Sequence, residues 1–206
     1  MTPAAWLEQG AAELGLSLTE AQYNTLLAFH AGLLKWNRAY NLTAVRDPEQ
    51  MMIRHLLDSL ALVPWVRPGE VLDVGTGAGL PGVVLAIVCP DVEVTCLDGN
   101  GKKIRFIRQM AMELKLNSVR PVQMRAEDFT GSFNQITSRA LATLVDMIGW
   151  TEHLLAPGGE WLAMKGQYPD AEIAALPALI QVAEVVPLKV PGLAAERHCV
   201  RMVREC

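Results

Sequence analysis

Residues 71–79 read Val71-Leu72-Asp73-Val74-Gly75-Thr76-Gly77-Ala78-Gly79, a short apolar run that passes into three glycines at alternate positions. A short apolar run bounded by glycines is typical of a buried strand. Glycine is needed where a chain turns sharply and where its backbone must approach a ligand closely. The stretch therefore predicts a strand, a tight glycine turn and the start of a helix. A turn that binds no ligand is the alternative.

The spacing of the glycines separates two classes of cofactor. Dinucleotide-binding loops have the pattern G-x-G-x-x-G, which would need a third glycine where this chain has Leu80. Here the third glycine is Gly79, and G-x-G-x-G is the pattern of loops that bind S-adenosylmethionine (AdoMet). We therefore predict that Gly75, Gly77 and Gly79 belong to an AdoMet loop.

A carboxylate follows at the end of the next predicted strand. Asp98 lies nineteen residues after Gly79, and an acid in this place can accept hydrogen bonds from both ribose hydroxyls of a nucleoside. Strand order brings the loop and the acid to the same edge of a sheet, so together they predict an AdoMet site. A cap on the helix predicted from Lys102 is the alternative for Asp98. Glu127 and Asp128, after the third strand, lie where adenine contacts are usual, and a solvated loop acid is the alternative for each.

Two kinds of patterning divide the chain. Residues 1–66 carry helix signals: Ser17 and Glu20 have the spacing of a capping box, and Asp47-Pro48 predicts the start of a further helix. Residues 67–206 alternate short apolar runs with helical patterns, which predicts a parallel sheet covered on both faces. We expect an N-terminal helical cap over residues 1–66 and an AdoMet-binding methyltransferase domain over residues 67–206.

The last two predicted strands decide between α/β architectures. Strands are predicted at 71–74, 92–97, 119–124, 135–138, 160–164, 182–190 and 198–203, and helices at 82–89, 102–116, 144–155 and 171–180. Only seven residues separate the last two strands, too few for a parallel crossover, so they must form an antiparallel hairpin. A seven-stranded, doubly wound sheet with a reversed C-terminal hairpin strand is the architecture of Rossmann-like class I AdoMet-dependent methyltransferases.

Composition restricts the classes of protein that remain. Of 206 residues, 51% are hydrophobic and 19% charged, which excludes a disordered or coiled-coil chain. No apolar run is long enough to cross a bilayer, and the first residues do not resemble a signal or transit peptide, so a cytoplasmic protein is expected. Four scattered histidines predict no metal site, and Cys89 and Cys96 are expected to be reduced core thiols.

Charge is unevenly distributed along the chain. The net charge of −4 argues against a general nucleic-acid binder. Residues 101–125, however, hold seven basic side chains and one acid, whereas residues 71–100 hold four acids and no base. This layout suits an enzyme that acts on a polyanion, and a solvated helix face is the alternative.

The chain also resembles a known family in motifs that follow in the family's order. They are Trp36-Asn37-x-x-Tyr40-Asn41-Leu42-Thr43, Arg54-His55-x-x-Asp58-Ser59, Asp73-Val74-Gly75-Thr76-Gly77-Ala78-Gly79-Leu80-Pro81-Gly82, Ser138-Arg139-Ala140, Met164-Lys165-Gly166 and Glu196-Arg197-His198. On these residues the chain is similar to the bacterial 16S ribosomal RNA guanine-N7 methyltransferase G family, formerly called glucose-inhibited division protein B. The resemblance covers nearly the whole chain.

This resemblance implies an enzyme that uses AdoMet to methylate guanine N7 in 16S rRNA, at nucleotide 527 of the 530 loop. Its partner would be the rRNA or the small ribosomal subunit, with no DNA and no membrane, and a monomer is expected. The resemblance also implies AdoMet contacts from Gly75, Leu80, Ala126, Glu127 and Arg139. The family usually has Asp-Ser where this chain has Asp98-Gly99, and the lost hydroxyl can loosen that loop.

Absent motifs narrow the reaction. The chain has no N-P-P-Y or D-P-P-Y loop for exocyclic amines and no Pro-Cys nucleophile for pyrimidine carbons, because Cys89-Pro90 is the reverse order. Guanine N7 has an exposed lone pair, so its methylation needs no general base and depends mainly on proximity and orientation. Arg125, Arg139, Lys165 and Arg197 are candidate RNA-side groups at predicted strand ends. A structural ion pair is the alternative for each.

Two local features and two rival functions complete the expectations. Arg54 and Asp58 are four residues apart, which predicts a helix-stabilising pair. The run from Trp36 to Tyr40 predicts an aromatic staple that docks the cap rather than a base-stacking platform.

A small-molecule methyltransferase is one alternative function, favoured by the acidic net charge. An AdoMet-binding ribosome-assembly factor that does not turn over is the other.

Overall fold

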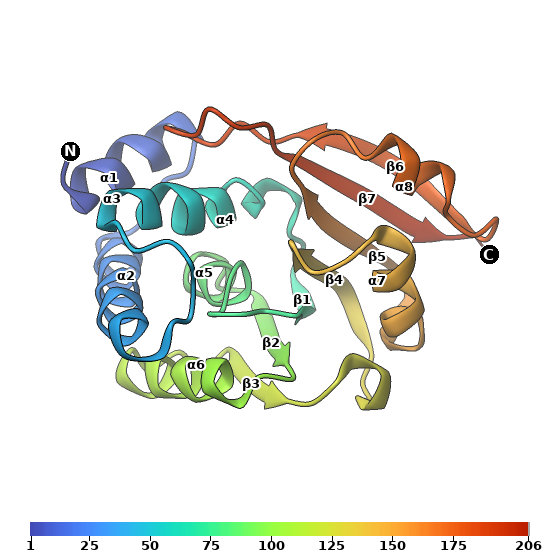
Figure 1. Ribbon diagram of the computed structural model, residues 1–206, viewed down its shortest axis with the longest axis horizontal. Helices are drawn as coiled ribbons and strands as arrows, with labels where there is room; N and C mark the ends of the chain where they lie inside the picture. Colours follow the sequence, from blue (N-terminus) through green and yellow to red (C-terminus); the bar gives the residue numbers. More distant parts are fainter. Residues whose placement is uncertain (206) are drawn as a thin grey trace.

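One seven-stranded sheet organises the computed structural model, which describes residues 1–205 (Figure 1). Its order is β3-β2-β1-β4-β5-β7-β6. The strands are β1 Gly69–Val74, β2 Val92–Asp98, β3 Val119–Gln123, β4 Phe133–Arg139, β5 Leu155–Lys165, β6 Ile180–Pro187 and β7 His198–Arg204. Strands β1 to β5 pair in parallel, and β1 lies between β2 and β4 where the strand order reverses. Ligands bind at the carboxyl ends of strands at such a point.

The C-terminal hairpin confirms the sequence prediction. Strand β7 pairs antiparallel with both neighbours, with Trp161 opposite Met202 on one side and Val185 opposite Val200 on the other. The fold is therefore the expected Rossmann-like sheet with a single reversed strand, β7.

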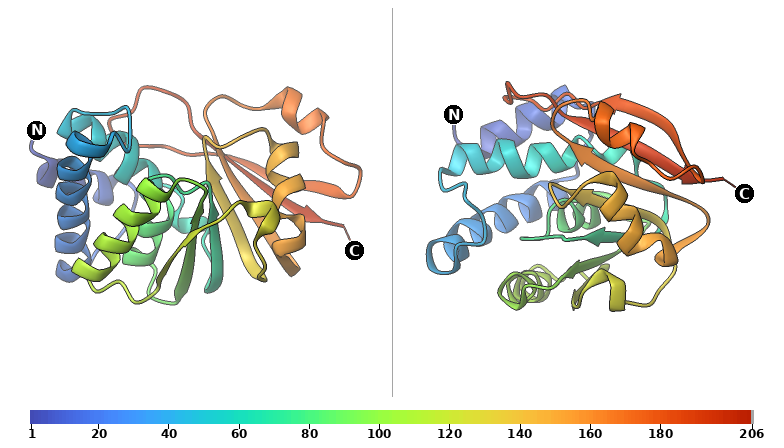
Figure 2. Two further views of the ribbon diagram at one scale, coloured as in Figure 1. Left: turned by 60° about the horizontal axis from the view of Figure 1, so that its bottom comes forward. Right: turned by 45° about the vertical axis from the view of Figure 1, so that its right-hand side comes forward.

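Helices cover both faces of the sheet (Figure 2). Helices α5 (Gly82–Val88) and α6 (Gly101–Glu113) follow β1 and β2, whereas α7 (Leu144–Thr151) and α8 (Asp170–Ala174) lie on the other side. Asn100 caps α6, because its side chain accepts a hydrogen bond from the Lys102 N–H (3.0 Å). The helix predicted at 171–180 is shorter than expected and ends before Pro177, which cannot continue it.

The first 66 residues form short and long helices over the α5 and α6 face. They are α1 Pro3–Glu13, α2 Glu20–Tyr40, α3 Pro48–Met51 and α4 Asp58–Leu60, with a π-helical stretch at Met52–Leu57 between the last two and a 3₁₀ turn at Val63–Trp65. The predicted capping box was wrong by two residues: Thr19 and Gln22 form it, not Ser17 and Glu20. The division of the chain near residue 67 stays a prediction.

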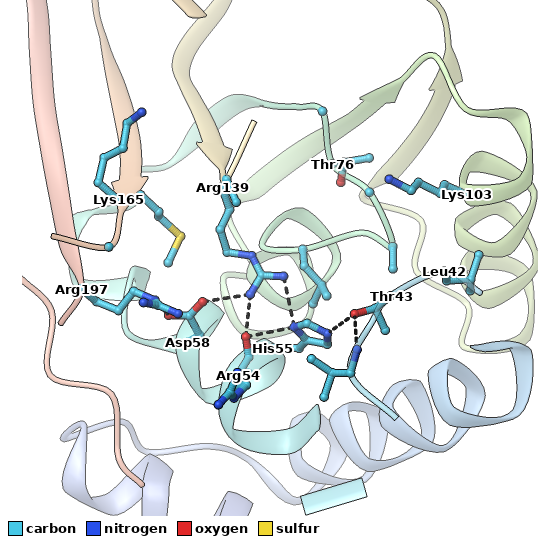
Figure 3. Close-up of a pocket in the computed structure, with 18 residues that line it drawn as sticks. Leu42, Thr43, Arg54, His55, Asp58, Thr76, Lys103, Arg139, Lys165 and Arg197 are labelled. Atoms are coloured by element: carbon cyan, nitrogen blue, oxygen red, sulfur yellow. Dashed lines mark hydrogen bonds and ion pairs between the residues drawn. The ribbon is translucent and has the colours of Figure 1, made fainter. Parts of the chain in front are cut away.

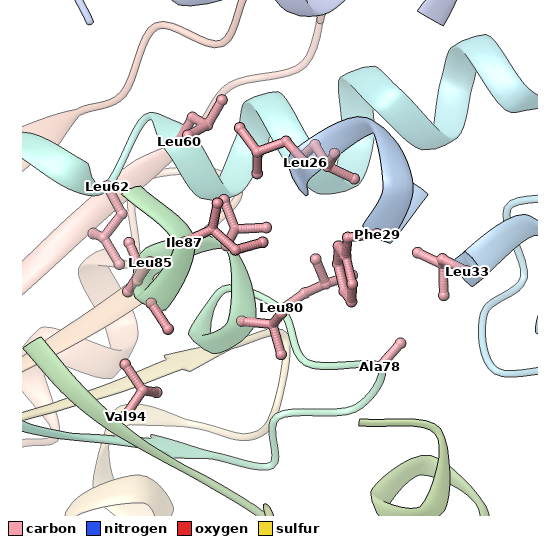
Figure 4. Close-up of a cluster of buried hydrophobic side chains, with 14 of the residues drawn as sticks. Leu26, Phe29, Leu33, Leu60, Leu62, Ala78, Leu80, Leu85, Ile87 and Val94 are labelled. Carbon is pink, nitrogen blue, oxygen red and sulfur yellow. The ribbon is translucent and has the colours of Figure 1, made fainter. Parts of the chain in front are cut away.

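These helices share a hydrophobic core with the sheet domain (Figure 4). Leu26, Phe29 and Leu33 of α2 are fully buried in one cluster with Leu85 and Val94. The Trp36 ring lies 5.7 Å from Phe106 of α6 and 5.1 Å from Tyr40, centroid to centroid. This packing confirms the staple interpretation and fixes the cap helices beside the carboxyl ends of the strands.

Three further features concern the cysteines, possible membrane-spanning helices and possible metal ligands. Cys96 and Cys199 are buried free thiols and Cys89 is a half-buried one. Among residues 1–205, no helix is both long and apolar enough to pass through a membrane. In the same part of the chain, His, Cys, Asp and Glu do not gather into any group that could hold a metal ion.

Candidate functional site

Two adjoining cavities open at the carboxyl ends of β1, β2 and β4. The larger, of about 500 Å³, is enclosed partly by the N-terminal helices and is called the cap cavity; its lining includes Leu42, Thr43, Arg54, His55, Asp58, Gly75, Thr76, Gly77, Leu80, Lys103, Arg139, Lys165 and Arg197. The other, of about 390 Å³, is called the strand-end cavity and is lined by residues that include Gly75, Asp98, Gly99, Lys103, Arg125, Ala126, Glu127, Leu141 and Trp150. Both walls contain Gly75, Lys103 and Ala140. Cavities of these sizes accommodate small ligands and cofactors.

The glycine loop separates the two cavities. Gly75 has a φ of +64° and Gly77 a φ of +60°, a conformation in which side chains are strained. A Cβ on Gly75 would collide with Leu141, whereas the nearest atom to one on Gly77 is the Lys103 Nζ at 3.8 Å. Gly79 has a different role: it reaches neither cavity wall, and its Cβ would lie 2.5 Å from Val83 of α5.

Asp98 anchors this loop at the end of β2. Its Oδ2 accepts a hydrogen bond from the Gly77 N–H (2.9 Å), and its Oδ1 accepts one from the Asn100 N–H (2.8 Å). The Lys103 Nζ lies 4.0 Å from Oδ2. Asn100, not Asp98, is the helix cap, so the alternative role considered for Asp98 is excluded. Each carboxylate oxygen can accept more than one hydrogen bond, which leaves capacity for a ligand in the strand-end cavity.

The predicted adenine-side residues lie together in the strand-end cavity. Ala126 and Glu127 begin a single 3₁₀ turn after β3, and Ala126 is buried. The Arg125 Nη2 donates to Glu127 Oε1 at 3.0 Å on an exposed surface. Arg125 therefore lies apart from the other candidate RNA-side groups, which line the cap cavity.

Asp58 lies in the wall of the cap cavity, between Arg139 and Arg197 (Figure 3). Its side chain is almost fully buried; Oδ2 accepts a hydrogen bond from Arg139 Nη1 (2.9 Å) and Oδ1 accepts one from Arg197 Nε (3.0 Å). The predicted Arg54–Asp58 pair was wrong, because Arg54 Nε donates to Gln50 instead (3.0 Å). Asp58 therefore pairs with Arg139 and Arg197, which are distant in the sequence. These two contacts join the N-terminal helices to the end of β4 and to the start of β7.

His55 lies beside this cluster as a neutral side chain. Its Nδ1 lies 2.9 Å from the Arg54 carbonyl oxygen and 3.3 Å from Arg139 Nη2. In the tautomer that carries the proton on Nδ1, this nitrogen donates to the carbonyl oxygen and Nε2 accepts a hydrogen bond from the Thr43 hydroxyl (2.8 Å). Burial, together with the nearby Arg139 charge, lowers the pKa of His55 to about 4. His55 therefore adds no positive charge to the cavity at neutral pH.

Lys165 is held on the opposite wall, at the end of β5. Its Nζ donates to the Ala142 carbonyl oxygen (2.6 Å) and to Glu172 Oε2 (2.7 Å). The structure thus brings three of the four candidate RNA-side groups, Arg139, Lys165 and Arg197, to one cavity, and each already has a partner within the protein.

Asp73 lies directly beneath the glycine loop and is completely buried. Its Oδ2 accepts hydrogen bonds from the Thr76 hydroxyl and from the Gly82 N–H (2.8 Å), whereas Oδ1 has no partner within residues 1–205. Burial raises the pKa of Asp73 to about 7, although these hydrogen bonds oppose the shift. Ionisation of this carboxyl therefore costs stability in the folded state.

This shift predicts a pH dependence of stability. Between about pH 4 and pH 7 the folded protein holds a proton that the unfolded chain has lost, so this group's stabilising contribution declines as pH rises, by up to about 1.4 kcal/mol per pH unit. Asp73→Asn should flatten this part of the profile of unfolding free energy. Urea unfolding across that range measures both slopes. Equal slopes in wild type and variant would show that Asp73 is not the titrating group.

The fold and the site together define a class I, Rossmann-like AdoMet-dependent methyltransferase. Solved structures share the fold: a predicted O-methyltransferase from Agrobacterium tumefaciens (TM-score 0.61, 19% identity, 74% of this chain and 81% of that chain) and a SAM-dependent methyltransferase from Aquifex aeolicus (TM-score 0.57, 17% identity, 76% and 94%). The family described as rRNA small subunit methyltransferase G matches residues 22–200, and the chain belongs to it.

Relatives at full length agree with this assignment. The ribosomal RNA small subunit methyltransferase G of Chromohalobacter salexigens is 56% identical over 207 residues, which cover 99% of this chain and 100% of that protein. The protein of the same name from Escherichia fergusonii is 50% identical over 190 residues, 91% of this chain and 92% of the relative. The family resemblance seen in the sequence is confirmed.

Residue-level reasoning missed most of the cap's contribution to the site. Thr43, His55 and Asp58 line the cap cavity, as does Lys103 from α6. The motifs that contain the first three were visible in the sequence, but nothing in their local spacing indicated a shared cavity. His55 and Asp58 lie in the mostly apolar stretch of residues 51–62, and these two polar side chains were the available signal.

Proposed function

We propose that this protein transfers the methyl group of AdoMet to N7 of a guanosine in 16S rRNA, at nucleotide 527. One observation carries the proposal: the glycine loop and Asp98 form a nucleoside-sized cavity that adjoins a cavity lined by five basic side chains and one carboxylate. Family membership and the printed names of its relatives support the rRNA substrate.

The residues of both cavities fit AdoMet. Asp98 would accept hydrogen bonds from the ribose hydroxyls, and Ala126 with Glu127 would adjoin the adenine. Gly75 lines both cavities, so its bare backbone lets a ligand pass from one to the other. Lys103 lines both as well and offers a cation to a carboxylate. When bound, AdoMet supplies an activated methyl group.

The basic wall of the cap cavity fits a polyanionic acceptor. Arg54, Lys103, Arg139, Lys165 and Arg197 line it, with Asp58 as the single carboxylate. Arginine can donate to guanine O6 or, in bidentate fashion, to a phosphate, and both contacts leave the N7 lone pair free. A donor pair on O6 and phosphate would hold the base so that its N7 faces the methyl group.

No side chain in the cap cavity has to act as a base. His55 is neutral but already committed to Thr43 and the Arg54 carbonyl. Cys89 follows α5, which begins at the carboxyl edge of the sheet and ends at the opposite edge, and burial raises its thiol pKa to about 11. A thiolate mechanism at Cys89 is therefore excluded, in agreement with a reaction governed by orientation.

Labelling with tritiated AdoMet tests the proposal. Purified protein is offered 16S rRNA, assembled small subunits and a pool of small metabolites, and the labelled position is mapped. Label on one guanosine of the RNA or subunit is expected. Label in the metabolite pool would favour a small-molecule methyltransferase, and AdoMet binding without transfer would favour an assembly factor. RNA that carries 7-deazaguanosine at the target must remain unlabelled if N7 is the acceptor.

The pH dependence of the chemical step gives a second test. Because N7 loses no proton, the single-turnover rate should be nearly flat from about pH 6.5 to 8.5. Asp73 titrates within this range but lines neither cavity, so its effect is expected on unfolding rather than on transfer. Cys89→Ser should leave the rate unchanged. A rate that climbs about tenfold per pH unit would instead require an ionising base and would contradict an N7 acceptor.

A further inference from the structure

Asp58 is the only carboxylate among the residues that line the cap cavity, where it faces five basic side chains. It begins α4, and its exposed fraction is 1%. A buried carboxylate needs compensating partners, and each of its two oxygens has an arginine. Arg54, one helical turn before Asp58, donates to Gln50 rather than to this carboxylate.

The carboxylate holds two guanidinium groups that come from distant strands. Arg139 is the last residue of β4 and is fixed at Nη1 by Asp58 Oδ2 (2.9 Å) and by the Arg54 carbonyl oxygen (2.7 Å). Arg197 precedes β7 and is fixed at Nε by Asp58 Oδ1 (3.0 Å) and at Nη1 by the Glu196 carbonyl oxygen (2.8 Å). Figure 3 shows Asp58 between the two arginines.

These hydrogen bonds fix the orientation of each guanidinium group as well as the position of its charge. A guanidinium group is a planar fork, so fixing one edge determines where its other N–H groups point. Methylation at N7 leaves a positive charge on the purine, and two unpaired arginines beside it would oppose that charge. Asp58 offsets part of this repulsion in a cavity where charges interact strongly.

We infer that Asp58 is a positioning residue of the methyl transfer, which aligns Arg139 and Arg197 on the acceptor guanosine and balances their charge. The inference rests on the proposed function. It makes the N-terminal helices part of the acceptor site, because the cap supplies the carboxylate to which both arginines are bound.

Asp58→Asn tests the inference with almost no change in shape. An amide can accept from one arginine but presents N–H groups to the other. A misaligned acceptor is expected to slow single-turnover transfer about 100-fold at saturating AdoMet and RNA, while AdoMet affinity by calorimetry falls by a much smaller factor. Glu49→Gln is the matched control, because Glu49 is a cap carboxylate that pairs with the N-terminal amine outside the cavity. It should transfer at the wild-type rate.

A double-variant comparison separates positioning from mere structural support. If Asp58 acts through Arg197, Asp58→Asn in an Arg197→Gln background should slow transfer at least about fivefold less than it does alone. Full additivity, an unchanged rate, or an equal loss of AdoMet affinity would overturn the inference. If Asp58→Asn does not fold, Arg197→Lys replaces it in the test. Lysine keeps the positive charge but loses the planar guanidinium fork. An Arg197→Lys variant with the wild-type transfer rate would also contradict the positioning role of Asp58.

Failure of the inference is distinguishable from failure of the proposed function. A wild-type protein that labels RNA equally with guanosine or 7-deazaguanosine at the target contradicts N7 chemistry, whatever Asp58→Asn does. A wild-type protein that is specific for N7, with an equally active and folded Asp58→Asn variant, contradicts only the role of Asp58. The unfolding midpoint of each variant, measured first, shows that the rates refer to folded protein.

Discussion

Replacing Arg139 by glutamine is expected to slow methyl transfer about 10²–10³-fold at saturating AdoMet and RNA. Arg139 ends β4 and lines the cap cavity, with its side chain fixed by Asp58 and the Arg54 carbonyl oxygen. Glutamine keeps an amide donor but loses the charge and the planar fork, so it can neither pair in bidentate fashion with a phosphate nor give guanine O6 a charged donor. Single-turnover kinetics with preformed complexes measure the change without a contribution from product release.

Two further variants give this experiment its controls. Arg139→Lys keeps the charge and should recover only part of the rate, because an ammonium group does not reproduce the fork. Arg125→Gln removes an exposed arginine that pairs with Glu127 outside the cap cavity, and it should cost far less. Arg139→Gln also leaves Asp58 with one charged partner, so the unfolding free energy must be measured beside the rate. A folded Arg139→Gln variant with the wild-type rate would remove Arg139 from the acceptor site.

The parallel part of the fold was predictable because its signals are local. Residues 71–79 place an apolar run directly before glycines that need positive φ, so strand, turn and helix follow from one stretch. The final hairpin followed from a connection too short to cross over. The start of β5 was missed: Leu155 to Gly159 were expected to be a helix end and turn, but Leu155 pairs with Phe133 before a shift in register. Pairing with a neighbouring strand overrides local preference in such a segment.

Helix starts show a different limit. Ser17 with Glu20 and Thr19 with Gln22 both have capping-box spacing, and the sequence offers no basis for choosing between them. The structure selects Thr19, whose side chain accepts from the Gln22 N–H (3.2 Å), and Gln22 additionally donates to the Val88 carbonyl oxygen (3.0 Å). A contact with α5, 66 positions away, thus accompanies the choice of cap.

The candidate site also has one part that the sequence predicts and one part that it does not. The glycine loop and Asp98 were predictable because parallel strands bring their carboxyl ends to one edge. The partners of Asp58 were not, because Arg139 and Arg197 lie 81 and 139 positions away, whereas Arg54 offered a local pair at helical spacing. Sequence spacing predicts contacts within one helix, but only the assembled fold brings the cap against two strand ends.

Gly75→Val is expected to abolish measurable AdoMet binding. Two effects add at this position: a side chain at a φ of +64° is strained by about 1–2 kcal/mol, and its Cβ would collide with Leu141, which lines the strand-end cavity. Valine is worse than alanine because its branched Cβ has few rotamers that avoid the backbone. Calorimetric titration with AdoMet measures the loss, and circular dichroism shows whether the sheet is retained.

A graded series of glycines isolates the cause. Gly99→Ala should bind as wild type, because a Cβ there meets nothing within 4 Å. Gly77→Ala introduces strain without a collision, at a φ of +60°, so AdoMet affinity or unfolding free energy should fall by about 1–2 kcal/mol, depending on whether the loop relaxes or holds its shape. Gly75→Val should exceed that loss by the cost of displacing Leu141 and narrowing the passage between the cavities. If Gly75→Val bound AdoMet as tightly as Gly77→Ala, the shared wall at Gly75 would not be where the cofactor passes, and the two cavities would have to be assigned to separate ligands.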